Sequence, residues 1–461
     1  MLVLTFYTVR GDSATGLCTY FASPTGQGDG RTGAHPFDVG DFWGIAKPGD
    51  TLCLTNGVYR GKGAMIAPPR GLSGRSDRPI TVRALSDGKV FVDGEGKNSP
   101  IRLVYSDWFV IEGVDACCSA GTVVGLDHSN RNVIRRVAAW DAADGNHSIF
   151  GVHYGEHNLL EDVAGWGIAR KIFESSQRGN VTTIRRAWGR WEGSHVVGPK
   201  MVYTLAYNNY DMIVENSIGT WSGEKMKKSY VLLDYYGKPW AGRGEGLYDD
   251  YQVNQPLAVF GMDGMDKDKT ARTKLLGSIA YVRAGDAFKA PYLVFITKLN
   301  SVEIADTLAY VEPGAYSEVK TFGLHGFNLR DVLKGLTGPS TSVLARNLTS
   351  LGGAGAVIQK DWDTRNLLEG SSPSAYGATK SAFQTTRGAN LCRRYVDGIL
   401  TGQPLWPWPM NQRILDAMIR SGRRPVDVTD TIESFLGPIP SPCRSPAERP
   451  GATGPPNPPR P

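Results

Sequence analysis

The sequence lacks the patterns that identify several common functional classes. No apolar stretch reaches the roughly 18 residues of a membrane-spanning helix, and no long run of Lys and Arg occurs. The chain has no P-loop, no Gly-x-Ser-x-Gly turn and no His-Glu-x-x-His motif. It also has no Cys-x-x-Cys pair and no Cys/His cluster with zinc spacing. We therefore expect no transmembrane segment and no nucleic-acid partner.

Cysteine is scarce in this chain of 461 residues, and its spacing suggests cross-links. Cys18 with Cys53, and Cys392 with Cys443, are candidates for disulfides outside the cytosol; buried free thiols are the equal alternative. The adjacent pair at 117 and 118 is expected to point to opposite faces of a strand. Residues 1–17 are interpreted as the remnant of a signal peptide or as an N-terminal extension, which favours an extracellular or cell-surface location.

Turn-forming and aromatic residues are abundant by contrast. The chain has 56 Gly, 28 Pro, 11 Trp, 19 Tyr and 15 Phe, a mixture that predicts many turns and excludes full disorder. The formal net charge is +6, from 51 basic and 45 acidic residues. This mild excess would suit an acidic polysaccharide, but an ordinary mixed surface accounts for it better.

A repeated phrase decides the predicted fold. An Asn, Asp or aromatic residue precedes a short alternating strand, and a small residue follows. From Ile111 the equivalent apolar position returns after 23, 26, 24 and 30 residues. The copies include 108–114, 132–138, 158–164, 180–187 and 211–217, with weaker ones at 275–280, 302–306 and 343–347. This period fits one coil of a solenoid made of short strands, and the leucine-rich repeat signature is missing.

A second strand precedes each phrase. These β-branched and aromatic runs lie at 122–126, 149–154, 171–175, 201–205, 257–260, 292–296 and 322–326. Asn residues recur in the turns, where a ladder of their side chains is expected to stabilise the stack. The prediction is an all-β, right-handed parallel β-helix at 18–370 with a small helical C-terminal extension.

The N-terminal coils resemble the pectate-lyase-like β-helix superfamily. The resemblance rests on 20–30, on 47–52 with Lys47-Pro48-Gly49-Asp50, on 57–60, on 79–84, and on 90–94 with Val92-Asp93-Gly94. The resemblance covers roughly residues 20 to 350. In this part the chain is similar to secreted polysaccharide lyases of the chondroitinase B and alginate lyase type. The resemblance implies a polysaccharide partner, Ca²⁺ as cofactor, and a basic catalytic residue on an outward strand position. This chain departs from the family pattern because no carboxylate cluster matches the calcium ligands, so the metal ligands stay undefined.

Basic and acidic side chains on neighbouring coils are the candidate chemistry. A uronate lyase needs a base beside a sugar carboxylate and a group that neutralises this carboxylate. The candidate catalytic residues are Lys171, Glu174, His153, Lys200 and Tyr203. The candidate substrate-binding residues are Asp127, Arg178, Trp221, Tyr235, Tyr236 and Trp240. The alternative is an ordinary solvated outer wall, and a register error of one residue would exchange the two faces.

An aromatic insertion at 218–252 interrupts the repeat. It carries four of the residues assigned above to substrate binding, and a long loop on a rigid scaffold often carries function. Packing of these aromatic residues against the solenoid wall is the equal alternative. The segment 263–268 is interpreted as a turn and not as a calcium loop, since it lacks the spacing of an EF-hand.

The C-terminal region loses the coil pattern. We predict a helical cap at 371–437, with helices near 411–420 and 426–436, and a Pro-rich disordered tail at 438–461. The leading functional hypothesis is a secreted protein that binds an acidic polysaccharide and cleaves it by β-elimination. The alternatives are a non-catalytic adhesive or filament-forming β-helix and a glycoside hydrolase of the same fold. Asp141 with Asp144, or Asp249 with Asp250, would be the paired carboxylates of the hydrolase.

Overall fold

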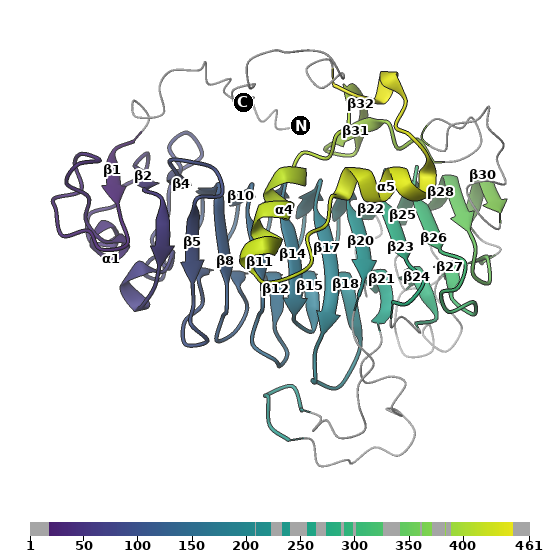
Figure 1. Ribbon diagram of the computed structural model, residues 1–461, viewed down its shortest axis with the longest axis horizontal. Coiled ribbons are helices and arrows are strands. Elements are labelled where there is room, and N and C mark those ends of the chain that lie inside the picture. Colours follow the sequence, from purple (N-terminus) through teal and green to yellow (C-terminus); the bar gives the residue numbers. More distant parts are fainter. Residues whose placement is uncertain are drawn as a thin grey trace.

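The computed structural model shows a long solenoid of parallel strands (Figure 1). It describes residues 18–207, 209–222, 233–239, 256–263, 273–286, 290–297, 301–325, 342–359, 362–370, 383 and 389–445. From Ile80 to Leu324 each coil contributes one strand to each of three columns, and the strands of a column pair in parallel from coil to coil. The predicted right-handed parallel β-helix is confirmed.

The first column of strands carries the repeated phrase of the sequence. It consists of β1 (Tyr20–Ala22), β2 (Thr51–Leu54), β4 (Ile80–Ala84), β7 (Phe109–Glu112), β10 (Val133–Arg135), β13 (Leu159–Glu161), β16 (Thr183–Arg185), β19 (Ile213–Glu215), β22 (Thr273–Leu276), β25 (Ser301–Ala305), β28 (Ser342–Leu351) and β30 (Asp363–Gly370). A single left-handed residue ends most of these strands, as at Arg136, Asp162 and Arg186. It turns the chain into the second column.

The second column follows directly and shares the last two long strands. It consists of β3 (Gly57–Tyr59), β5 (Val90–Asp93), β8 (Val114–Cys117), β11 (Ala138–Trp140), β14 (Ala164–Ile168), β17 (Trp188–Gly193), β20 (Ile218–Trp221), β23 (Ile279–Val282) and β26 (Leu308–Val311), and then the carboxyl halves of β28 and β30. Because β20 occupies Ile218–Trp221, the insertion begins after this strand and not at residue 218.

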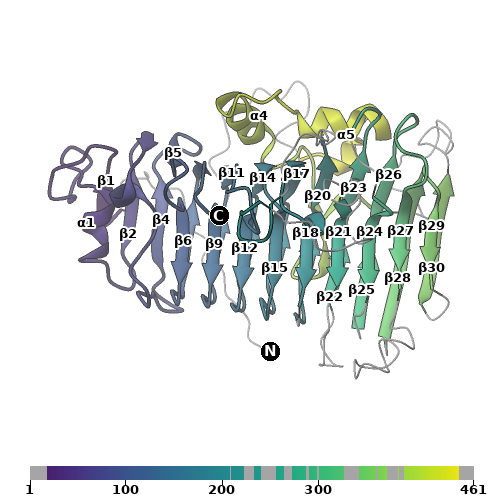
Figure 2. The same ribbon diagram turned by 90° about the horizontal axis from the view of Figure 1, so that it is seen from below.

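The third column lies beyond the longer turns of each coil. It consists of β6 (Ile101–Val104), β9 (Val124–Asp127), β12 (Ser148–His153), β15 (Lys171–Ser176), β18 (Lys200–Ala206), β21 (Pro256–Asp263), β24 (Tyr292–Thr297), β27 (Lys320–Leu324) and β29 (Ala356–Ile358). Figure 2 shows these strands as one continuous sheet along the solenoid.

The core runs through the middle of the stack. Inward residues repeat from coil to coil, as in the stacked rings of Phe150, Phe173, Tyr203 and Phe260, whose centroids lie 4.9, 4.8 and 4.4 Å apart. Small residues of the second column face this aromatic stack. At Gly165 an added Cβ would stand 2.7 Å from Ile172, so the strand needs glycine there.

The predicted Asn ladder is present in the turns before the first column. Asn132 Oδ1 accepts the backbone N–H of Phe109 at 2.8 Å, and Asn158 Oδ1 accepts that of Asn132 at 3.0 Å. Both side chains are buried and satisfy backbone donors that the turns leave unpaired. They stabilise the stack and are not part of a site.

Opposite charges also pair across coils on the outer face of the first column. Glu112, Arg135, Glu161, Arg185 and Glu215 occupy one register position in successive strands. Arg135 and Arg185 both donate to Glu161, at 2.9 and 3.1 Å. Because a one-residue slip would break every pair, this alternation pins the register.

The C-terminal region folds back onto the outer wall of the second column (Figure 1). The hairpin of β31 (Arg393–Val396) and β32 (Ile399–Pro404) leads into α4 (Asn411–Arg420) and α5 (Val428–Leu436), close to the two predicted helices. Among the described residues no helix is long and apolar enough to cross a bilayer. The remaining short elements are α1 (Val39–Trp43) and the 3₁₀ turns η2 (Lys62–Ala64) and η4 (Ser441–Cys443).

All six cysteines form disulfides. Cys18 pairs with Cys53 and Cys392 with Cys443, as the sequence suggested. Cys117 pairs with its neighbour Cys118, so the expectation that these two point to opposite faces is wrong. The strand ends at Cys117, and Cys118 has a positive φ of 60°, which turns its side chain back.

Candidate functional site

The outer face of the third column contains two adjacent rows of side chains that cross the coils. The first row, called here the upper row, pairs Arg102, Gly125, Gly151 and Glu174 in register on β6, β9, β12 and β15. The second, called here the lower row, pairs Asp127, His153 and Ser176 two residues further along the strands. Successive positions in a row are about 4.8 Å apart, as in any sheet.

A buried ion pair lies at the centre of this face. Glu174 Oε1 lies 2.5 Å from Lys171 Nζ, and both side chains are almost completely buried. Glu174 also accepts hydrogen bonds from the hydroxyls of Ser148, at 2.5 Å, and Ser176, at 3.0 Å. A buried charge needs such partners to persist.

The carboxylate of Glu174 is held ionised by its neighbours. Burial alone would raise its pKa, but the Lys171 ammonium and His153 hold the pKa of Glu174 well below its usual value. The alternative interpretation, in which Lys171 and Glu174 are ordinary solvated side chains of the outer wall, is therefore wrong. Lys171 is also not a free base, because its ammonium is occupied by Glu174 and has little access to solvent.

His153 is the member of this group that reaches solvent. Its side chain is 33% exposed, and its Nε2 lies 3.5 Å from Glu174 Oε2. The imidazole crosses above Gly151: an added Cβ at this glycine would lie 3.5 Å from His153 Cε1 and 3.3 Å from Thr122 Cγ2. Glu174 thus orients one ring nitrogen, and Nδ1 is the nitrogen directed away from the carboxylate. Such a pair suits a general base.

Two residues assigned to the site lie elsewhere. Tyr203 points into the core, where its hydroxyl donates to the carbonyls of Ala187 and Ile218 at 2.8 and 2.9 Å. Trp221 is also buried and stacks on Trp191, with ring centroids 3.7 Å apart. The sequence interpretation placed both on the outside, but each packs inside the solenoid and cannot touch a ligand on the outer face.

Lys200 lies beneath a loop that borders the third column. Its ammonium donates to the carbonyls of Val196 and Gly198, and the residue is fully buried. Burial, with Arg170 nearby, lowers the pKa of Lys200 to about 7 against the opposing effect of Asp144. The lysine holds the loop 194–199 in place and presents no group to the outer face.

The remaining predicted residues border the site at different distances. Asp127 is in the lower row next to His153 and lies 2.8 Å from His128 Nδ1. Arg178 is exposed in the turn after β15. Tyr235 stands beside Arg170, whose guanidinium lies 4.6 Å from the ring centroid, and Tyr236 is 89% exposed. Trp240 lies outside the described residues.

A second histidine and carboxylate pair lies in the loops before the third column. Asp144 accepts His195 Nδ1 and, at 2.8 Å, the backbone N–H of His195. Asp141, the proposed hydrolase partner of Asp144, instead accepts the backbone N–H of Ile168 and the guanidinium of Arg423. Because each aspartate has its own structural partner, this pair does not form a hydrolase site. The other pair, Asp249 and Asp250, lies outside the described residues.

The calcium implied by the family resemblance does not fit this face. Ca²⁺ takes six to eight oxygen ligands, mostly from carboxylates and carbonyls. Within the part of the chain that the structure describes, only Asp93, Cys117 and Cys118 form a cluster with metal-ligand spacing, and the two cysteines are bonded to each other. Glu174 is occupied by Lys171, so no step below uses a metal.

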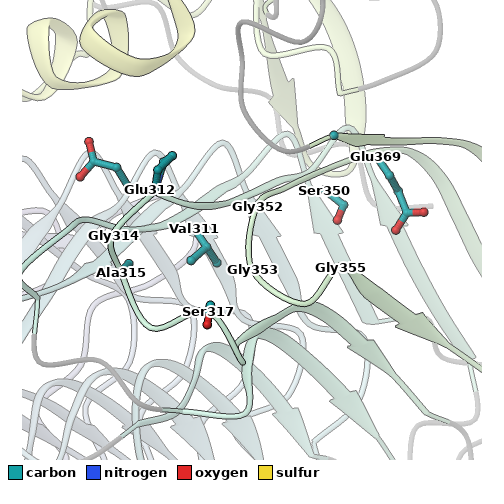
Figure 3. A pocket seen from close by; sticks show the side chains of 12 residues that line it. Val311, Glu312, Gly314, Ala315, Ser317, Ser350, Gly352, Gly353, Gly355 and Glu369 are labelled. Carbon is teal, nitrogen blue, oxygen red and sulfur yellow. The ribbon is translucent and has the colours of Figure 1, made fainter.

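A cavity of about 570 Å³ lies near the C-terminal coils, away from this site (Figure 3). It is lined by residues of 311–317, 350–355 and 369–370, five of which are glycine. The carboxylates of Glu312 and Glu369 point away from each other (Figure 3) and accept the backbone N–H groups of Ala284 and Ala356. The cavity offers shape but no convergent chemistry.

Sequence reasoning missed Arg102, Ser148 and Ser176. Arg102 lies on β6. The set of repeated strands found in the sequence begins one coil later, at 122–126, and does not include β6. Its alternating segment Ile101-Arg102-Leu103-Val104 was a usable signal, since two inward apolar residues flank the arginine. The two serines gave no signal, because their role depends on their contacts with Glu174.

Comparison with known proteins agrees with the architecture. No protein-family model matches the chain, and no curated protein matches it. Among solved structures, the pectate lyase Pel9A aligns with a TM-score of 0.50 at 13% identity, covering 88% of this chain and 94% of its own. A rhamnogalacturonan lyase aligns with a TM-score of 0.42 at 15% identity, covering 87% and 97%. An alginate lyase from Paenibacillus sp. str. FPU-7 aligns with a TM-score of 0.31 at 15% identity, covering 63% and 95%.

At these identities the likeness concerns the fold and not the activity. Three observations support the same fold: the columns of parallel strands, the single-residue bends between them, and the alignment with the pectate lyase over most of both chains. The chain has the pectate-lyase-like right-handed parallel β-helix fold.

Proposed function

We propose that this protein binds a polymeric acidic polysaccharide on the outer face of the third column and cleaves it by β-elimination. The observation that carries the proposal is the contact between the partly exposed His153 and the buried, ionised Glu174. A pair of this kind provides an oriented base on a rigid sheet, where a polymer can lie across the coils.

In this reaction His153 Nδ1 takes the proton from the sugar carbon next to the carboxylate. The electron pair left behind forms a double bond to the neighbouring carbon, and the bond to the glycosidic oxygen breaks. Water supplies the proton that the leaving oxygen needs. Glu174 is a positioning residue, since it touches His153 and not the sugar. Lys171 keeps Glu174 ionised, so that the carboxylate can hold the His153 ring in place.

We also propose that the protein works outside the cytosol. All six cysteines are paired, and structural disulfides persist in oxidising compartments. The fold similarity to the lyases named above adds weight to a carbohydrate substrate, although it is a likeness of fold alone.

The test is the absorbance of unsaturated uronides during incubation with polygalacturonate, alginate and chondroitin sulfate, each with and without added Ca²⁺. We expect product from at least one polymer, and a His153→Ala variant should lose activity about 10²–10⁴-fold. Ile419→Ala, an exposed position on α4, is the matched control and should keep full activity. Product formation that is unchanged in His153→Ala would contradict the assigned base. Absence of product from every polymer with folded protein would leave a binding role as the better account.

A further inference from the structure

The glycines of the upper row do not have the same surroundings. Gly261 and Gly323 continue this row on β21 and β27, and neighbouring side chains fill the space above them. Met201 Sδ would stand 2.0 Å from an added Cβ at Gly261, and the Tyr292 ring 2.3 Å from one at Gly323. At Gly125, by contrast, only atoms of Thr122 come within 4 Å, the nearer at 3.6 Å.

Nothing in the fold explains glycine at position 125. Its backbone is not in the left-handed region, and an alanine methyl would meet only an ordinary contact. Glycine inside a strand costs roughly 0.5–1 kcal/mol relative to alanine and often marks a close approach by a ligand. The strand surface at Gly125 is thus the floor of an open space, and two chemically different side chains border this space.

Arg102 stands at one end of this floor. It pairs in register with Gly125, its side chain points outward, and it is exposed. Within the described part of the chain no hydrogen bond or ion pair of its guanidinium is found. The nearest acidic position of the lower row, Asp127, already contacts His128. His153, in the lower row, lies across the floor two coils from Arg102, a separation of about 10 Å in the direction of the solenoid axis.

We infer that Arg102 and the floor at Gly125 form a distal subsite for a second uronate residue of the same polymer. One sugar carboxylate pairs with the guanidinium fork of Arg102, the chain passes over Gly125, and the sugar that reacts lies at His153. The inference deepens the proposed function and rests on it for the identity of the reacting sugar. It requires a polymer that runs parallel to the solenoid axis, with a charged group on more than one residue.

The test uses binding, so that it does not depend on cleavage. Affinities of oligogalacturonate and oligomannuronate hexasaccharides are measured by calorimetry on His153→Ala protein and on the same protein carrying Arg102→Gln. A charge-assisted contact to a partly exposed arginine is worth about one order of magnitude, so we expect about tenfold weaker binding of the oligomer that binds best. Arg102→Lys should recover only part of the loss, because lysine lacks the planar fork.

Two further variants sharpen the result. Gly125→Leu should weaken binding by a similar factor, because its side chain fills the floor, and Gly125→Ala should weaken binding by a smaller factor, because a methyl group fills only part of it. Arg424→Gln, an exposed arginine of the C-terminal region, is the matched charge control. Equal affinity in Arg102→Gln and Arg424→Gln would overturn the subsite, even with lyase activity present. If binding weakens only with Arg102→Gln and the parent protein, with His153 intact, shows no lyase activity, the subsite is sustained and the cleavage is rejected.

Discussion

The outer walls of the second and third columns differ in polarity and in what covers them. The second column presents Trp140, Trp166 and Trp188, and all three are buried beneath α4 and α5. The third column presents His153, Asp127 and Arg102 with glycine between them, and no helix of the described residues crosses it (Figure 2). The same coil geometry thus produces a covered apolar wall and an open polar one. The outward side chains of each column determine whether its wall is apolar and covered or polar and open.

Charge reinforces this division. Arginines of the C-terminal region reach acidic groups that face the covered wall: Arg413 and Arg420 contact Asp115, and Arg423 contacts Asp141 and Glu192. Asp115 is nearly inaccessible, so its charge is compensated only by this contact. On the open wall, by contrast, the compensated pair of Lys171 and Glu174 is internal to one strand, and the exposed groups beside it stay available.

The largest stability effect is expected on the covered wall. Trp166→Ala removes an indole that stacks on Trp140 with centroids 5.3 Å apart and should lower the free energy of unfolding by about 4 kcal/mol. Activity per folded molecule should not change. Urea denaturation measures the first effect and the uronide assay the second. A loss below about 1 kcal/mol would mean that the C-terminal region does not close this wall.

Glu174→Gln on the open wall should be nearly as damaging to stability. It leaves the Lys171 ammonium buried without its partner, at a cost of about 3–4 kcal/mol. The double variant Lys171→Met with Glu174→Gln should recover most of this loss, because no uncompensated charge remains. If the double variant is as unstable as the sum of both single variants, the two residues are not coupled as described.

Acid should weaken the structure through Glu161 in the first column. Burial favours its protonation, but Arg186, Arg135 and Arg185 hold the pKa of Glu161 at about 2. The folded pKa is lower than the unfolded one, so the stabilisation is fully present above about pH 4.5 and is lost as the pH falls towards 2. It amounts to about 3 kcal/mol. Denaturation of Glu161→Gln across this range should show a flatter pH dependence than the parent, and equal slopes would contradict this role.

The smallest effect is expected at Gly151. An added methyl group would stand 3.3 Å from Thr122 Cγ2 and in ordinary contact, at 3.5 Å, with the His153 ring, so Gly151→Ala should shift Thr122 by a few tenths of an ångström and restrict the space of the imidazole. We expect kcat to fall about threefold, since small misplacement of a catalytic group is costly. Gly402→Ala in β32, where an added Cβ would meet nothing within 4 Å, is the matched control. Identical kcat values in both variants would show that the ring does not depend on the space above Gly151.

The sequence predicts the solenoid well because the repeat is local. A period of 23–30 residues and the Asn positions 132 and 158 follow from the chain itself, and the structure confirms both. The register within the third column was harder to predict from the sequence. Consecutive inward residues, such as Ile172 with Phe173, break the alternation of a strand, and this placed Tyr203 on the wrong face.

The chemistry of the site was predictable only in part. Lys171, Glu174 and His153 were chosen because they lie on neighbouring coils, and the structure brings the three together. Whether lysine is a base or a counter-ion depends on burial, which the sequence does not reveal. Arg102 was missed for a different reason: its strand precedes the repeated set of strands found in the sequence, and its place beside Gly125 one coil away depends on the register of the sheet.

The most direct test of the division between the two walls is a crystal structure of His153→Ala protein soaked with the oligouronate that binds best. The account predicts sugar rings along the third column, over Gly125 and Gly151, with a carboxylate at Arg102. Rings bound in the cavity of Figure 3 or against the second column, with the third column bare, would contradict it.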